Sequence, residues 1–203
     1  MSPRKGGSRD RMVLSAALLL REYGASATSI DRVLGHSGAP RGSVYYHFPG
    51  GRAQLIDEAV AFAGDFIGGL IENMMQGDDP VEAIDAFFSM WREQLVESEF
   101  RAGCPIVAVA VESNDEAPQL ARSTAAVFGR WQEALAAKFV RHGLPEERGK
   151  RLAAFVVAAV EGAVIMCRAE QSAAPLEAAA AEIHDLLTYA LRGLPDTGPA
   201  QRP

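Results

Sequence analysis

Apolar residues recur every three or four positions along almost the whole chain, and this spacing restricts the fold more than any other feature. Met12, Ala16, Leu19 and Tyr23 form one such stripe near the amino end. Runs of alternating apolar and polar residues are nearly absent, and no Asn-Gly hairpin turn occurs. A period near 3.6 predicts amphipathic helices, whereas strands need a period of two. The sequence therefore predicts an all-α fold.

Glycine, proline and capping residues divide the chain into helical segments. Gly24 ends the first helix, Thr28 caps the second, and Pro40 opens a short third one. Residues 103–113 are β-branched enough for a buried strand. With no partner strand elsewhere, we expect a buried helix there. The predicted helices cover residues 9–23, 28–34, 40–48, 53–76, 80–95, 103–113, 117–141, 145–171 and 175–192, after a flexible arm over 1–8.

Composition is that of a globular protein: of 203 residues, 48% are hydrophobic and 23% are charged. Two cysteines make a disulfide scaffold a poor hypothesis, and no secretion signal is visible. The longest apolar stretch, Leu152–Cys167, is 16 residues long and contains Glu161. It is too short and too interrupted for a good membrane span. We expect a cytoplasmic protein that has no membrane partner.

Charge is distributed unevenly along the chain. Residues 1–55 hold eight basic and three acidic residues, a net charge of +5, whereas residues 56–203 carry −11. The overall charge of −6 hides this asymmetry. A basic segment joined to an acidic remainder suggests that a polyanion is contacted at one end only.

Residues 28–47 have the pattern of a helix-turn-helix: a capped helix, a glycine-containing turn and a second short helix. A helix that enters the major groove needs a small, polar amino-terminal face, so that its backbone comes close to base edges. Pro40, Arg41, Gly42 and Ser43 supply that face. Gly42 is a poor helix former, and close approach to a partner is a reason to keep it.

The residues around this element suit phosphate contacts. Tyr45 and His47 offer donors beyond the turn. The Thr28 hydroxyl and the free N–H groups at the start of the second helix can hold one phosphate, and Arg52 can hold another.

This region resembles the DNA-binding domain of the TetR family of bacterial transcriptional regulators. The resemblance rests on Thr28-Ser29-Ile30-Asp31 and on Gly38 through Phe48, within about the first 60 residues. Residues 103–112, Gly-Cys-Pro-Ile-Val-Ala-Val-Ala-Val-Glu, are similar to a segment of the LmrA/YxaF-like branch. The resemblance implies an all-helical homodimer of about nine helices, with three that bind DNA.

Carried over by position, the resemblance places the DNA contacts at Thr28, Pro40, Arg41, Gly42, Ser43, Tyr45, His47 and Arg52. Pro40 stands where many members have Ser or Thr, so one side-chain contact is lost. The resulting division is a DNA-binding domain over 1–52, a ligand-binding and dimerisation domain over 53–194, and a flexible tail over 195–203.

Aromatic side chains are concentrated in the second part of the chain, mixed with Ala and Gly. Most of them belong to the core, but apolar cavities with few polar groups are also typical ligand sites. The candidate ligand-binding residues are Phe66, Met90, Trp91, Cys104, Val107, Phe128, Trp131 and Met166.

Leu152–Cys167 is apolar nearly all round and must be buried on several sides. Together with the Ala-rich segment 175–192 it suits a two-fold interface, so we expect a homodimer through residues 145–192. Glu161 needs a partner or a place near the pocket, because an unpaired buried carboxylate is costly.

Catalytic motifs are missing from the sequence: it contains no nucleophile elbow, P-loop, His-Glu-x-x-His or Cys-x-x-Cys. We therefore expect no catalytic residue, no metal site and no cofactor. The leading hypothesis is a regulator, in the first instance a repressor, released from a palindromic operator by a small apolar or aromatic effector. The alternative is a helical small-molecule binding protein, or an enzyme, with a vestigial DNA-binding head.

Overall fold

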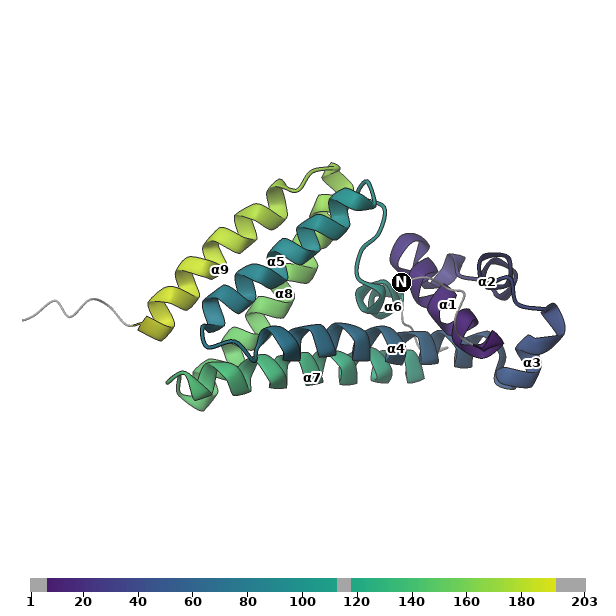
Figure 1. The fold of residues 1–203 in the computed structure, drawn as a ribbon, viewed down its shortest axis with the longest axis horizontal. Helices are drawn as coiled ribbons and strands as arrows, with labels where there is room; N and C mark the ends of the chain where they lie inside the picture. The colour runs from purple at the N-terminus through teal and green to yellow at the C-terminus, as the bar shows by residue number, and fades with distance from the viewer. Residues whose placement is uncertain (1–6, 113–117, 193–203) are drawn as a thin grey trace, which may run out of the picture.

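The computed structural model describes residues 7–112 and 118–192, and these fold into helices without any strand (Figure 1). The predicted all-α fold is confirmed. The helices are α1 Ser8–Ala27, α2 Ile30–Ser37, α3 Val44–His47, α4 Gly51–Met74, α5 Pro80–Glu97, α6 Pro105–Glu112, α7 Pro118–Arg141, α8 Glu146–Glu170 and α9 Ala174–Arg192, with a 3-10 turn over Arg41–Ser43. The predicted tail over 195–203 and most of the predicted arm over 1–8 lie outside the described residues.

Helices α1, α2 and α3 gather at one end of the molecule, which we call the head (Figure 1). Gly24 interrupts α1 with φ 80° and ψ 176°, where the sequence predicted its end. The predicted cap at Thr28 is wrong by one residue. Ser29 caps α2 instead, because its side chain accepts a hydrogen bond from the Arg32 N–H at 3.2 Å.

Helix α4 runs out of the head and along α7 through the rest of the molecule, which we call the body (Figure 1). Helices α8 and α9 pack together and lie beside α5. Asp79 caps α5 by accepting from the Val81 N–H at 2.7 Å, as the Asp-Pro pair predicted. The 103–113 segment is helical over Pro105–Glu112, so its interpretation as a helix is confirmed.

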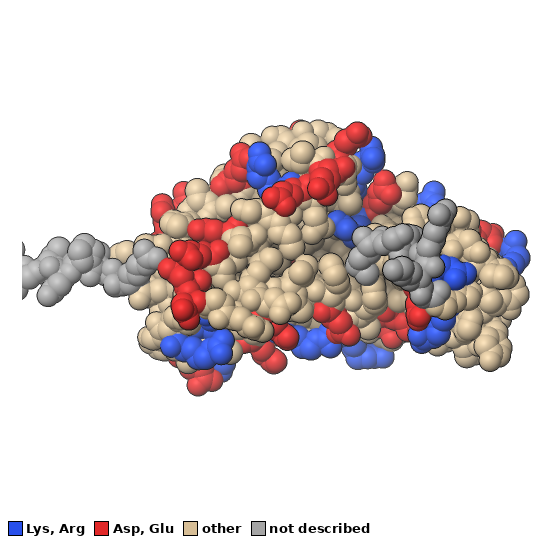
Figure 2. Space-filling model, in the orientation of Figure 1, with Lys and Arg blue, Asp and Glu red and all other residues tan. Residues whose placement is uncertain are grey.

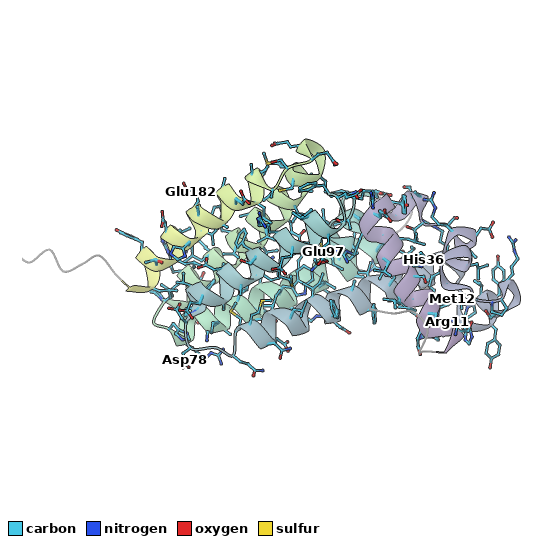
Figure 3. The ribbon with its side chains drawn as sticks, turned by 45° about the horizontal axis from the view of Figure 1, so that its top comes forward. Arg11, Met12, His36, Asp78, Glu97 and Glu182 are labelled. Carbon is cyan, nitrogen blue, oxygen red and sulfur yellow. The ribbon has the colours of Figure 1, made fainter. Side chains whose placement is uncertain are left out.

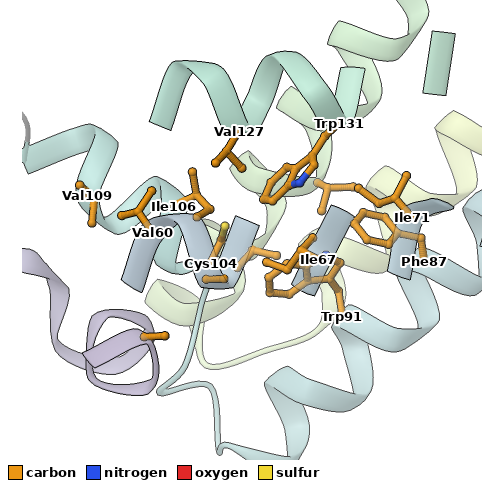
Figure 4. Close-up of a cluster of buried hydrophobic side chains, with 14 of the residues drawn as sticks. Val60, Ile67, Ile71, Phe87, Trp91, Cys104, Ile106, Val109, Val127 and Trp131 are labelled. Atoms are coloured by element: carbon orange, nitrogen blue, oxygen red, sulfur yellow. The ribbon is translucent and has the colours of Figure 1, made fainter. Parts of the chain in front are cut away.

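The core of the body forms where α4, α5, α6 and α7 meet (Figure 4). Gly64 lets α4 approach α7 closely, because a Cβ there would lie 2.5 Å from a methyl group of Val127. The Trp131 indole N–H donates to the Gly64 carbonyl at 3.1 Å and fixes the same contact. Gly64 thus marks a point of close packing between α4 and α7.

Helix α8 is apolar along most of its length, as predicted, but one face lacks a cover. Phe155, Ile165 and Met166 are 54%, 49% and 52% exposed, whereas Leu152, Val156 and Val160 are buried. By length and composition alone α8 could cross a membrane, yet half of its most apolar window is buried inside the protein. Core helices of soluble proteins pass the same test.

Candidate nucleic-acid interface and cavity

The turn from Pro40 to Ser43 lies on the outside of the head. Pro40, Arg41 and Gly42 are exposed, and a Cβ at Gly42 would meet nothing within 4 Å. The absence of a side chain at Gly42 is therefore not required by internal packing. Space above this backbone is open to a partner.

Two buried side chains hold the following helix in place. Val44 is 1% exposed and Phe48 is 0% exposed, so α3 is anchored to the core on that side. Tyr45 and Tyr46 point the other way and are 67% and 83% exposed, while His47 is half-buried. Two neighbouring exposed phenols on an anchored helix provide donors at fixed positions.

The turn itself is held by local hydrogen bonds. The Ser43 hydroxyl donates to the Pro40 carbonyl at 2.6 Å and lies 3.2 Å from the hydroxyl of Ser8. The Arg41 guanidinium forms an exposed ion pair with Asp31 at 2.6 Å. An exposed pair of this kind is weak, so Arg41 can exchange Asp31 for another anion at low cost.

Two predicted contacts occupy a different setting. Thr28 is fully buried, and its hydroxyl donates to the Gly24 carbonyl at 2.7 Å. The Arg52 guanidinium donates to the Thr28 carbonyl at 3.0 Å and to the carbonyl of Ala25. In this structure both side chains fix the link between α1 and α2. Their contact with DNA remains a prediction.

Charged side chains are spread over the face in Figure 2. Acidic side chains gather over the α5 and α9 part, and basic side chains lie at the end that holds α2 and α3 as well as elsewhere along the molecule. Figure 3 places Arg11 and His36 on the head, far from Asp78 and Glu182. Of the basic residues in the described range 7–55, Arg32 and Arg41 are exposed on α2 and on the turn, whereas Arg21 lines the cavity and Arg52 donates to backbone carbonyls.

A cavity of about 70 Å³ lies where the head meets the body. Its walls come from α1, α4, α5 and α6, and they are apolar apart from Arg21 and Gln94. The lining residues are Leu14, Ala17, Leu18, Arg21, Phe62, Ala63, Phe66, Ile67, Leu70, Met90, Trp91, Gln94 and Pro105.

Three of the eight predicted ligand-binding residues, Phe66, Met90 and Trp91, line this cavity. The other five, namely Cys104, Val107, Phe128, Trp131 and Met166, do not. Sequence reasoning missed the wall from α1, including Arg21. The apolar positions of α1 gave no indication of which side packs on the body.

Glu161 is buried close to the start of α6. The Glu161 carboxyl group has the Cys104 thiol as a hydrogen-bond partner. The Oε2 atom of Glu161 has no partner among the described residues. Burial raises the pKa of Glu161 to about 7. Burial, and then the nearby Glu161 charge, raise the pKa of Cys104 well above its usual value. The thiol therefore stays protonated and is a weak nucleophile.

The exposed turn over residues 40–43, which we call the reading turn, is anchored by buried neighbours and carried on an all-helical protein. This is the arrangement of a helix-turn-helix DNA-binding protein. Residues 13–59 match the bacterial regulatory proteins of the tetR family, and residues 80–182 match the LmrA/YxaF-like C-terminal domain of transcriptional regulators.

Relatives agree with both matches. An HTH-type transcriptional regulator of Mycobacterium tuberculosis is 46% identical over 187 residues, which cover 89% of this chain and 94% of the relative. LmrA of Bacillus subtilis, an HTH-type transcriptional regulator, is 31% identical over 183 residues, or 90% and 97% of the two chains. The chain belongs to the TetR family, with an LmrA/YxaF-like C-terminal domain, and the predicted resemblance is confirmed.

A solved structure of the TetR family regulator CifR shares the fold. Its TM-score is 0.71 at 19% identity, and the match covers 96% of this chain and 100% of CifR. That structure includes a complex with a 26-base-pair operator duplex.

Proposed function

We propose that the chain is a ligand-responsive repressor that binds a palindromic operator as a homodimer. The observation that carries the proposal is the open space above Gly42, on a turn whose neighbours Val44 and Phe48 are buried. A fixed backbone with free space above it can approach base edges closely. The TetR family consists of DNA-binding transcriptional regulators, and its soluble members are cytoplasmic in general.

The proposed DNA-binding residues fall into two groups. Pro40, Arg41, Gly42 and Tyr45 are exposed and meet the duplex directly, with Ser43 and His47 beside them. Thr28 and Arg52 position the DNA-binding surface indirectly, because their hydrogen bonds hold the segment that leads into α2. We keep residues 1–52 as the DNA-binding domain and 53–194 as the ligand-binding and dimerisation domain.

The uncovered face of α8 supports the homodimer. Phe155 and Met166 are eleven residues apart, about three turns, so they lie on the same side of the helix, with Ile165 beside Met166. All three are about half exposed. Large contiguous apolar surfaces on soluble proteins mark interaction sites. In a two-fold dimer formed through residues 145–192, the same face of a second copy covers this face. The two reading turns then lie about 34 Å apart, one turn of B-DNA.

The position of α4 is the observation that supports the proposed ligand response. It contributes Phe62, Phe66 and Ile67 to the cavity, and its first turn carries Arg52, which holds the α1–α2 link. An effector that displaces α4 therefore changes the position of the head. Coupling of this kind is typically 5- to 150-fold in affinity.

Selection of bound duplexes from a random pool tests the proposal. We expect enrichment of one near-palindromic sequence with half-sites about ten base pairs apart, centre to centre. Failure to enrich any sequence at low salt would overturn the proposal. Compounds that release the selected duplex would then identify the effector class.

A further inference from the structure

The cavity joins the two parts of the molecule. Leu14, Ala17 and Leu18 reach it from α1 in the head, and Phe62, Phe66 and Trp91 reach it from α4 and α5 in the body. A molecule bound here touches the head without an intermediate element. The apolar and aromatic walls favour a ligand with ring surfaces.

Arg21 brings a positive charge to the cavity, and its hydrogen-bond partners within the described part of the chain are neutral oxygens. Its Nε donates to the Gly103 carbonyl at 3.2 Å, and its Nη2 donates to Gln94 Oε1 at 2.5 Å. Both acceptors are neutral, and no carboxylate among the described residues forms an ion pair with Arg21. Several other arginines are paired with carboxylates, namely Arg9, Arg41, Arg92, Arg101 and Arg130. Arg32, Arg52 and Arg168 donate to carbonyl oxygens, as Arg21 does, but of these four only Arg21 lines the cavity.

The surroundings of Arg21 make an anionic partner favourable. Burial lowers the pKa of Arg21, so its charged form is poorly solvated. A guanidinium presents several N–H donors in a plane and binds planar anions through two parallel hydrogen bonds. An anionic oxygen can replace the neutral oxygen of Gln94, whose amide is then free to donate to the same ligand.

We propose that this cavity binds an aromatic molecule carrying an anionic oxygen, with Arg21 as the anchor of that oxygen. The regulatory part of this inference rests on the proposed function. At about 70 Å³ the cavity is smaller than typical ligand sites, which have volumes of several hundred Å³. A ring-sized ligand therefore requires α1 to move away from α4 and α5. Binding selects a displaced head, and operator affinity falls.

Two fluorescent probes with similar rings test the site in the full-length protein. One is anilinonaphthalene sulfonate, which carries an anion, and the other is the uncharged N-phenylnaphthylamine. We expect Arg21→Met to weaken the sulfonate probe by about 10-fold or more, the size of a lost charge-assisted hydrogen bond, and to leave the neutral probe within about twofold.

Control variants separate this site from others. Arg130→Met removes an exposed arginine of α7 and should change neither affinity. Ala63→Leu fills the cavity from α4 and should weaken both probes. Arg21→Lys keeps the charge without the planar fork, and we expect an intermediate loss of sulfonate affinity. It replaces Arg21→Met if that variant fails to fold. Equal effects of Arg21→Met and Arg130→Met, or unchanged binding in Ala63→Leu, would overturn the site.

The selected duplex distinguishes the site from the proposed function. Release of the duplex by the sulfonate probe from the wild type, but not from Arg21→Met, supports both. Probe binding that depends on Arg21 without any release keeps the site and removes the ligand response. Release that is equal in Arg21→Met keeps the ligand response and removes the site.

Discussion

At the scale of single residues, Gly42 and Glu161 differ in what they affect: Gly42 bears on binding and Glu161 on stability. Gly42 is exposed with open space above it, so the fold itself does not require a glycine there. Glu161 is buried with one carboxylate oxygen unpartnered among the described residues, so the fold tolerates it at a cost. The first residue bears on a partner outside the chain, and the second bears on stability.

Gly42→Glu tests the reading turn. The new side chain fills the space above the backbone and brings a negative charge to the phosphates, so we expect operator affinity to fall by about 100-fold or more. Gly35→Glu is the matched control, because Gly35 is also exposed in the head with nothing within 4 Å of its Cβ position. It should cost about tenfold or less. Equal losses in titrations of the selected duplex would show that only net charge matters.

Glu161→Gln tests the buried carboxylate through pH. The folded-state pKa is about 7 and the ordinary value is 4.5, so below about pH 4.5 the group is protonated in both states and costs nothing. As pH rises from 4.5 through 7, Glu161 ionises in the unfolded chain before it ionises in the folded protein. This favours the unfolded state, and the free energy of unfolding falls by about 3 kcal/mol.

The glutamine variant lacks this loss. Its unfolding free energy relative to wild type should therefore rise between pH 5 and pH 8, as measured by urea unfolding at several pH values. A difference that does not change with pH would contradict the raised pKa.

At the scale of elements, α6 and the residues just before it are hydrogen-bonded to α1 at two places, which together we call the bridge. At its start the Gly103 N–H donates to the Arg21 carbonyl at 2.9 Å, and Arg21 Nε donates back to Gly103. At its end Glu112 accepts hydrogen bonds from the Ala25 and Ser26 N–H groups, beside the break at Gly24. Both ends of one short helix are thus tied to the head, and Pro105 of the same helix lines the cavity.

Glu112→Ala tests this bridge. Without the carboxylate, the Gly24–Ser26 turn loses its hydrogen bonds to α6, and movement of the body reaches the head less effectively. We expect the change in operator affinity caused by a releasing ligand to shrink several-fold, while the ligand's own affinity for the free protein changes little. Glu97→Ala, an exposed carboxylate of α5, serves as the control. An undiminished ligand effect in Glu112→Ala would exclude the bridge.

The sequence predicted the elements better than their contacts. Periodicity and caps located the helices within a few residues, because each helix depends on its own stripe and ends. Thr28 and Ser29 are both good caps, however, and only the turn at Gly24 decides that Thr28 points inward. For the same reason, the α1 wall of the cavity was missed. Periodicity identifies an apolar face but does not identify its partner.

At the scale of the whole molecule, a series of packed helices links the head to the α8 face. Helix α4 connects the head to α7, and α7 packs on α8. A dimer formed through α8 therefore sets the distance between two heads, and a shift of α4 changes it. If the chain acts as proposed, operator affinity depends on dimerisation as well as on the reading turn.

Phe155→Glu tests the homodimer. A carboxylate on the uncovered α8 face would be buried on association, so we expect the dimer to dissociate at micromolar concentrations. Sedimentation should then give the mass of one chain, and affinity for the full operator should fall by at least tenfold, towards that of a half-site. Val96→Glu provides the matched control, since Val96 is 47% exposed on α5, outside residues 145–192. If Phe155→Glu sediments as wild type does, the dimer does not use this face of α8.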